Sequence, residues 1–404
     1  MDNDYEWIRN KAKFDFIDRG AEDLIAIKNT GNLPEDFYKY AYDFQEAADI
    51  LMSYLTNEAS PKGLNGYLDT WFFSITYLYR QSLELMVKSL MFKVYHKQDM
   101  KDIIGKVRHD LSMCLSEINE HLHRDDKAWN WLCDFLCDIS NIDKESDMFR
   151  YPFSSQMNRF FEKQQGANIF VIKKNMNTAF TMLKDIYFEI NFDEKRYDAY
   201  EPKLLIDAGG YHDRSIFGYQ YLSGIFYPYV KSYIETAEYL RGKMKDSGYQ
   251  KKELFMPMCY LYRNAVELSL KQILLEDLAI SRDEKEKVLR KKKHSVQGLW
   301  NSIEPEVIKE AGPNDDPDTL VSARCYIEQL HSIDGESTRF RYPVDKGLNL
   351  YFKETKRYNI NNVARCFNEL CNFLSGVDGM MSAHREWEAE MRAEMMSYME
   401  TDYY

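Results

Sequence analysis

The chain has 404 residues, of which 45% are hydrophobic and 15% aromatic, so it is long enough for two globular domains and is not a disordered polymer. Its formal net charge of −12 argues against broad non-specific binding to nucleic acid, although a local basic pocket is compatible with that charge. No apolar run approaches the roughly 18 residues that a membrane span needs. Seven cysteines without a CxxC pair indicate free thiols in a reducing cytoplasm.

Scarce glycine and proline, together with apolar spacing near 3.6 residues, predict an all-α protein. In the first half of the chain, the spacing predicts helices near residues 40–55, 69–95, 109–122 and 128–139. The second half follows the same order. The predicted units are an N-terminal extension over 1–35, a first repeat over 36–190, a linker over 191–216, a second repeat over 217–378 and a charged helix over 379–404.

Two short motifs occur twice, in the same order. Tyr77-Leu78-Tyr79-Arg80 recurs as Tyr260-Leu261-Tyr262-Arg263, a shift of 183 residues (263 − 80). Phe149-Arg150-Tyr151-Pro152 recurs as Phe340-Arg341-Tyr342-Pro343, a shift of 191 residues (340 − 149). Two copies of one module predict an internal pseudo-twofold pair. After each of these Pro corners, short extended segments predict a small β-hairpin against each bundle.

The central helix of each repeat carries one narrow charged stripe on an otherwise apolar surface. The stripe residues are Arg80, Glu84 and Lys88 in the first copy, and Arg263, Glu267 and Lys271 in the second. In a structural interpretation, each glutamate neutralises the cations of its own helix and also receives the corner arginine, Arg150 or Arg341. Asp143 and Asp334, which precede the corners, then cap a helix or neutralise an arginine. In a functional interpretation, the stripe cations line an anion-binding groove between the repeats.

Two histidines, His109 and His294, occupy matching positions, each after a basic stretch that in the second copy includes Arg290 and Lys292. A histidine at the start of a helix suits acid–base chemistry or contact with a phosphate. The competing interpretation is a packing residue beside a solvated basic loop. Both interpretations stay open at this point.

The duplicated pattern of Tyr-Arg-x3-Glu-Leu-x2-Lys, then histidine, then an acid and Phe-Arg-Tyr-Pro, resembles the HEPN superfamily, in particular HEPN domains of mobile-element and antiphage systems. The resemblance implies helical bundles that dimerise. Many such domains are metal-independent ribonucleases whose R-x4-6-H motifs meet at the dimer interface, and others are inactive binding or antitoxin proteins. Here no histidine follows Arg80 or Arg263 at that spacing, and the one formal match runs from Arg324 to His331.

These patterns predict two tandem HEPN-like bundles in a cytoplasmic prokaryotic defence or toxin–antitoxin-type protein, which binds or cleaves RNA, or binds a nucleotide, between its repeats. The alternative is a non-catalytic scaffold or regulatory subunit that binds partner proteins. No phosphate-binding loop, zinc-spaced cluster or nucleophile elbow occurs, so we expect no cofactor and no metal. Catalytic activity and homo-oligomerisation stay open. A groove holding both stripes would favour anion binding, whereas stripes neutralised inside each bundle would favour the scaffold.

Overall fold

The computed structural model describes residues 6–190, 197–218, 224–278, 280–312 and 317–401. Within these ranges it contains twelve α-helices and only short strands, which confirms the mostly helical prediction. The helices of the first copy are α1 (Leu33–Tyr54), α2 (Asn65–Val94), α3 (Lys97–Val107), α4 (Leu111–Leu122), α5 (Lys127–Ile142) and α6 (Ile169–Tyr187). Those of the second copy are α7 (Tyr227–Asp246), α8 (Phe255–Gln272), α9 (Arg282–Lys292), α10 (Val296–Glu310), α11 (Pro317–Asp334) and α12 (Ile360–Thr401).

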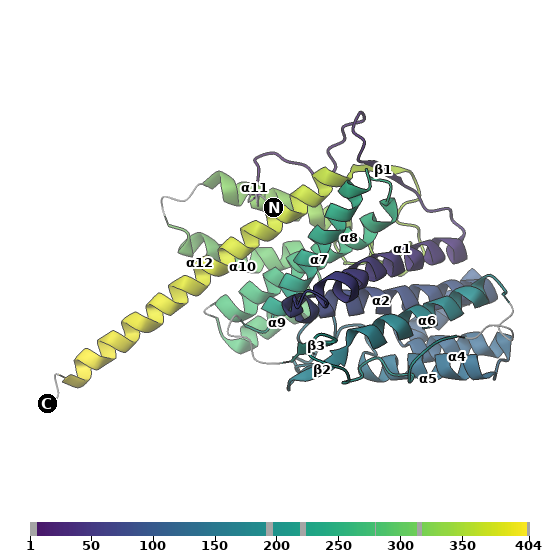
Figure 1. Cartoon of the computed structure of the whole chain (residues 1–404). Helices are drawn as coiled ribbons and strands as arrows, with labels where there is room; N and C mark the ends of the chain where they lie inside the picture. Colours follow the sequence, from purple (N-terminus) through teal and green to yellow (C-terminus); the bar gives the residue numbers. More distant parts are fainter. Residues whose placement is uncertain (1–5, 191–196, 219–223, 279, 313–316, 402–404) are drawn as a thin grey trace.

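Helices α2 and α8 form the centre of the molecule because their sequences are apolar on nearly every face. Every residue from Trp71 to Phe92 of α2 is buried, and so is every residue from Leu254 to Leu270 in and just before α8. Helix α2 packs against α1, α4, α6 and α7, while α8 packs against α7 and α12 (Figure 1). The contact between α2 and α7 joins the two copies.

Directly after each Pro corner, the chain makes one isolated antiparallel bridge, Phe153 with Arg159 and Val344 with Leu350, in place of the predicted hairpin. The longer strands pair across the two copies instead. Strand β2 (Gln165–Asn168) of the first copy pairs antiparallel with β3 (Arg214–Phe217), which precedes the second copy. Strand β4 (Lys356–Asn359) of the second copy pairs with β1 (Leu24–Ile27), which precedes the first copy. Each copy therefore completes a two-stranded sheet with the segment that leads into the other copy.

The N-terminal extension packs on the second copy as a consequence of this exchange. The ring of Phe14 meets the rings of Tyr326 and Phe367 edge-on, with centroids 5.8 and 5.0 Å away. The carboxylate of Asp23 accepts a 2.8 Å hydrogen bond from the backbone N–H of Asn361, in the first turn of α12. The extension is thus part of the second copy's core, although it comes first in the chain.

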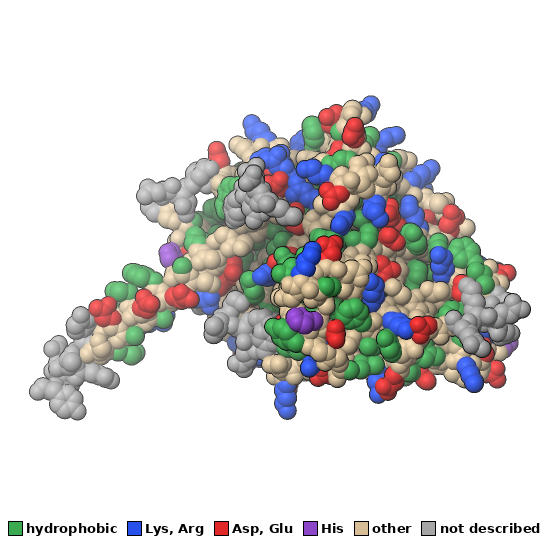
Figure 2. Space-filling model, viewed as in Figure 1, with side chains coloured by type: hydrophobic (Ala, Val, Ile, Leu, Met, Phe, Trp, Pro, Cys, Tyr) green, Lys and Arg blue, Asp and Glu red, His purple; other side chains and the backbone are tan. Residues whose placement is uncertain are grey.

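The sequence predicts the linker and the C-terminal segment as separate units, but in the structure neither one is separate from the repeat beside it. In the described part of the linker, Leu204 is fully buried and the carbonyl of Tyr200 accepts a 2.8 Å hydrogen bond from the indole of Trp131. Residues 191–196 lie outside the described residues. No break separates residues 378 and 379, because α12 continues to Thr401 and projects beyond the rest of the molecule (Figure 1). On this projecting part, apolar and acidic side chains are both exposed (Figure 2).

A carboxyl pair, Asp277 and Asp378, joins α12 to the short π-helix η3 (Ile273–Asp277) that continues α8. Burial, together with the adjacent Asp378, raises the pKa of Asp277 to about 8. Because the folded pKa lies above the unfolded one, folding stability from this group is present at acidic pH and is lost as the pH rises toward 8.

We therefore expect the contribution of Asp277 to lower the melting temperature of the wild type as the pH rises from about 4 to about 8, and to lower it less in Asp378→Asn. The amide removes the like charge and can still accept the hydrogen bond from Gln272. Thermal melts at several pH values measure this, with Asp246→Asn at the exposed end of α7 as the control. Identical pH profiles for wild type and Asp378→Asn would contradict the prediction.

Candidate functional site

The first centre forms around the buried carboxylate of Glu84 on α2. Lys88 donates to it at 2.6 Å, and Arg80 forms an ion pair with it one turn earlier. His109, in the loop before α4, lies 2.9 Å from the same carboxylate through Nδ1. Tyr342, from the corner of the second copy, donates its hydroxyl proton at 2.7 Å. Four side chains from both copies thus converge on one glutamate, which is 0% exposed.

The second centre repeats this arrangement around Glu267 on α8. Arg263 and Lys271 lie 3.0 and 2.7 Å from the carboxylate, and His294 Nδ1 lies 2.9 Å away. The hydroxyl of Tyr151, from the corner of the first copy, donates at 2.8 Å. The two centres therefore exchange tyrosines: each copy supplies a glutamate to its own centre and a tyrosine to the other.

Matching backbone conformations hold the two histidines. Arg108 and Lys293, each directly before a histidine, both have φ of 49°, a conformation that costs a non-glycine residue about 1–3 kcal/mol. The histidine carbonyls accept bonds from the buried guanidiniums, His109 from Arg80 at 2.6 Å and His294 from Arg263 at 2.7 Å. Each arginine thereby anchors both the glutamate and the histidine loop of its centre.

The corner arginines occupy a different place from the one predicted. Neither Arg150 nor Arg341 contacts a stripe glutamate. Arg150 Nε donates to the hydroxyl of Tyr260 at 3.1 Å, and Arg341 Nη1 donates to that of Tyr77 at 3.2 Å. The rings of Tyr77 and Tyr260, which are equivalent residues, stack with centroids 5.0 Å apart. These four residues join the corner of each repeat to the central helices at the contact between the two repeats.

The sequence predicts that the acids before the corners cap a helix or neutralise the nearby corner arginine, but each instead accepts backbone hydrogen bonds in the turn that leads into its corner. Asp143 Oδ1 accepts from the N–H of Asp147 at 2.8 Å, and its Oδ2 lies 3.4 Å from Arg80 Nε. Asp334 Oδ1 similarly accepts from the N–H of Thr338 at 2.8 Å, but it is its backbone carbonyl that meets Arg263. Burial raises the pKa of the Asp143 carboxyl above its usual value, although Arg80 opposes this.

The charges within each centre determine the protonation of its histidine. Burial would raise the pKa of Glu267, but Lys271, His294 and Arg263 lower it well below its usual range. The charge of Glu267 favours a protonated His294, yet burial of the ring and the cations Lys271 and Arg150 outweigh this effect and lower the pKa of His294. At neutral pH the centre therefore holds a carboxylate and a neutral imidazole. Glu84 and His109 shift in the same directions.

This protonation state fixes the tautomer. An ionised carboxylate has no proton to donate, so the 2.9 Å contact requires the proton to sit on His294 Nδ1. The opposite ring nitrogen, Nε2, then carries the free lone pair. His294 is 39% exposed in its side chain while Glu267 is fully buried, so the ring edge away from the glutamate is the accessible one. A histidine oriented by a buried carboxylate in this way can act as a general base.

A cavity of about 400 Å³ opens beside the second centre. Tyr151, Lys271 and His294 line it, and so do Arg290 and Lys293 at the end of α9, together with the acids Asp147 and Glu286. Lys271 pairs with Glu267 at 2.7 Å and Arg290 with Glu286 at 3.1 Å. The cavity therefore places the accessible histidine beside three basic side chains, of which Lys293 is the one without a paired acid among the described residues.

The other predicted residues lie apart from this cavity. Arg80 and Arg263 are 0% exposed and engaged by their glutamates, so they do not form groove walls as the functional interpretation required. Arg324, on α11, pairs with Glu304 of α10 at 2.8 Å. His331, also on α11, makes no hydrogen bond or ion pair with either stripe glutamate among the described residues. Lys292 ends α9 beside Gly298 of α10 and does not line the cavity.

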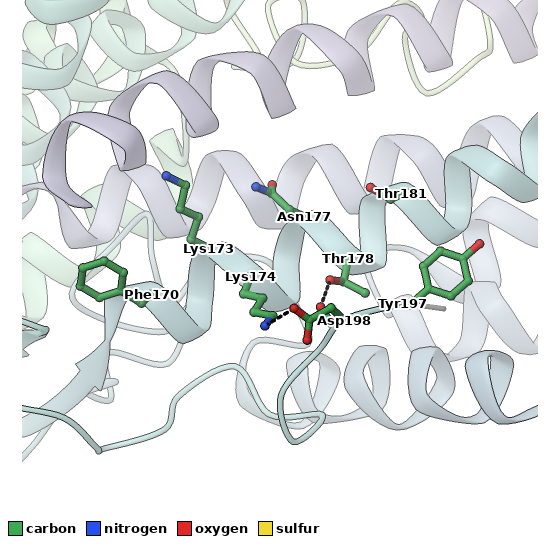
Figure 3. Close-up of a pocket in the computed structure, with 8 residues that line it drawn as sticks. All are labelled: Phe170, Lys173, Lys174, Asn177, Thr178, Thr181, Tyr197 and Asp198. Carbon is green, nitrogen blue, oxygen red and sulfur yellow. Dashed lines mark hydrogen bonds and ion pairs between the residues drawn. The ribbon is translucent and has the colours of Figure 1, made fainter. Parts of the chain in front are cut away.

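A second cavity, of about 440 Å³, lies along α6 (Figure 3). Its cations are already engaged, because Lys174 pairs with Asp198 at 2.6 Å and Lys173 donates to the hydroxyls of Ser53 and Thr56. Figure 3 shows these two lysines directed away from each other. None of the predicted site residues lines this cavity, so the second centre is the stronger candidate.

Sequence reasoning missed the roles of Tyr151 and Tyr342, although both belong to the repeated corner motif. The signal was the tyrosine itself, which stands at the same place in both corner motifs. Across the residues that the structure describes, no cluster of histidine, cysteine and acidic side chains is suited to hold a metal ion. In the same part of the chain, no helix has the length and apolar character to cross a membrane.

Comparisons with known proteins gave no match: no protein-family model fits this chain, and no curated protein or solved structure is significantly similar to it.

Proposed function

We propose that this chain binds RNA or a nucleotide in the cavity between its copies, and cleaves RNA there without a metal ion. The observation that carries the proposal is the His294–Glu267 pair, whose accessible imidazole lines a cavity that also contains Lys271, Arg290 and Lys293. A HEPN-like ancestry and a cytoplasmic defence role are part of the same proposal, on the strength of the duplicated motifs.

The chemistry that suits this geometry is attack of a ribose 2′-hydroxyl on the adjacent phosphorus. His294 Nε2 accepts the hydroxyl proton, which Glu267 favours by stabilising the imidazolium that forms. The O2′–P bond forms and the P–O5′ bond breaks, and the leaving oxygen takes a proton from the imidazolium. The Lys293 ammonium makes no hydrogen bond or ion pair within the described residues, so it is available for the charge that develops on phosphate.

Cleavage of a mixed-sequence RNA in EDTA tests this function. We expect His294→Ala and the double variant His109→Ala/His294→Ala to lose about 10²- to 10⁴-fold in rate, the usual contribution of a general base. His384→Ala is the matched control, because His384 is an exposed histidine on α12 that pairs with Glu310. Equal cleavage by wild type and the double variant would exclude these histidines from the reaction. RNA binding, measured in parallel, separates a binding protein from an enzyme.

A second function is a helical scaffold that binds a partner protein. Two observations favour it: the stripe cations are neutralised by Glu84 and Glu267 inside the molecule, and the projecting part of α12 exposes apolar side chains. Those side chains are Trp387, Met391 and Met395, at successive spacings of four residues on one helix face. Absence of both RNA binding and RNA cleavage in the wild type would favour this function.

A further inference from the structure

The two centres differ in what surrounds them, although their inner residues match. We infer that only the second centre binds ligand, and that this ligand is a single nucleotide unit whose base lies on an aromatic wall and whose phosphate lies on the basic end of α9. The inference rests on the proposed function, because it names the class of ligand for the same cavity.

The aromatic wall comes from both copies. Phe153 and Met157, from the first copy's corner, line the cavity with Phe226, which precedes α7 and is 2% exposed, so the half-buried Phe153 supplies most of the aromatic surface. The rings of Phe153 and Phe226 lie with centroids 6.0 Å apart. Aromatic side chains stack on every nucleobase, so such a wall binds a base without selecting its identity. Lys271, Arg290, Lys293 and His294 also line the cavity, together with the acids Asp147 and Glu286. A lining that combines apolar and basic side chains suits a ligand with an aromatic base and a phosphate.

The first centre differs from the second in both its apolar and its basic residues. With the 191-residue shift of the corner motif, Val344 (344 − 153) and Leu348 (348 − 157) stand in place of Phe153 and Met157. Both are only 6% exposed, whereas Phe153 and Met157 are half-buried and line the cavity. With the 185-residue shift of the histidines (294 − 109), Gly105 stands in place of Arg290. The first centre therefore lacks the aromatic surface and one cation, whereas Lys88, Arg108 and His109 stand in place of Lys271, Lys293 and His294.

The two corners nevertheless have the same backbone conformation at matching residues. Met157 and Leu348 have φ of 65° and 61°, and Ser146 and Ser337 have φ of 63° and 57°. The difference between the centres therefore lies in side chains on an equivalent backbone. Substitutions that copy one corner into the other should consequently alter the ligand site without altering the fold.

Titration calorimetry of the full chain with adenosine 5′-monophosphate tests the inference. We expect one nucleotide bound per chain, with adenosine and inorganic phosphate each binding more weakly, because adenosine lacks the phosphate and phosphate lacks the base. Phe153→Val, which copies Val344, should weaken binding about tenfold or more, since stacking on an aromatic ring contributes about 1–3 kcal/mol. Arg290→Ala should also weaken binding. The matched controls are Phe188→Val and Arg282→Ala, an exposed phenylalanine and an α9 arginine that also pairs with Glu286.

Several results would overturn the inference. Two nucleotides per chain would show that the first centre also binds. Inorganic phosphate binding as tightly as the nucleotide, with no effect of Phe153→Val, would exclude the aromatic wall. If RNA were bound or cleaved in a His294-dependent way while no mononucleotide bound, the proposed function would stand and this inference would fail. Circular dichroism and thermal melts of each variant establish that a loss of binding is not a loss of folding.

Discussion

Replacing Glu267 or Glu84 by alanine should lower the free energy of unfolding by about 3–5 kcal/mol, because each substitution leaves a buried arginine and lysine without their carboxylate. Arg263 and Arg80 are 0% exposed, so water cannot replace the missing partner. The destabilisation should also affect the other copy, because the hydroxyl of its tyrosine loses the carboxylate that accepts its hydrogen bond. Urea unfolding followed by tryptophan fluorescence measures this effect.

The matched control for this experiment is Glu286→Ala on α9. Glu286 also pairs with two arginines at i,i+4 spacing, but those arginines are 81% and 68% exposed, and exposed pairs contribute little. We expect a change within about 0.5 kcal/mol for this variant. Unfolding curves of Glu267→Ala and Glu84→Ala that coincide with wild type would show that the buried network does not support the fold.

Phe14→Ala should cost about 3–5 kcal/mol, the usual range for removing a buried phenylalanine. Phe14 is 1% exposed and sits between Tyr326 and Phe367. The more specific expectation concerns where the loss appears. Hydrogen exchange should accelerate in α11 and α12, which belong to the second copy, because the N-terminal extension packs there.

Phe16→Ala, two residues further on, is the matched control, since Phe16 is 58% exposed and its removal should change stability little. If the accelerated exchange in Phe14→Ala appeared in α5 and α6 of the first copy, the crossed packing of the extension would be wrong.

Much of the fold followed from local patterns. The helical character, the buried central helices and the pairing of Arg80 with Glu84 depend on residues three or four positions apart, which a helix brings together whatever surrounds it. The charge complementarity of Arg150 with the stripe, in contrast, suggested a contact that does not form. The next residue, Tyr151, reaches the glutamate of the other copy.

The exchanged contacts could not be predicted because a duplicated sequence gives each segment two equivalent partners. A strand of four residues such as β1 carries no information on whether it pairs with β2 or β4, and the choice depends on how the copies pack. The same holds for His109 and His294: their matching positions were visible, but their contacts with buried glutamates require the three-dimensional path of the loop.

The reciprocal exchange between copies also has an evolutionary consequence. Two identical chains assembled in this way would be bound by symmetry to carry two identical sites, so every change that closed one would close both. Joining the copies in one polypeptide removes that constraint. One half can then change its ligand surface, with Val344 and Gly105 in place of Phe153 and Arg290, and still keep the buried ionic network. The other half retains Phe153 and Arg290. Covalent fusion thus allows the two halves to have different roles, which two identical chains in a symmetric dimer cannot have.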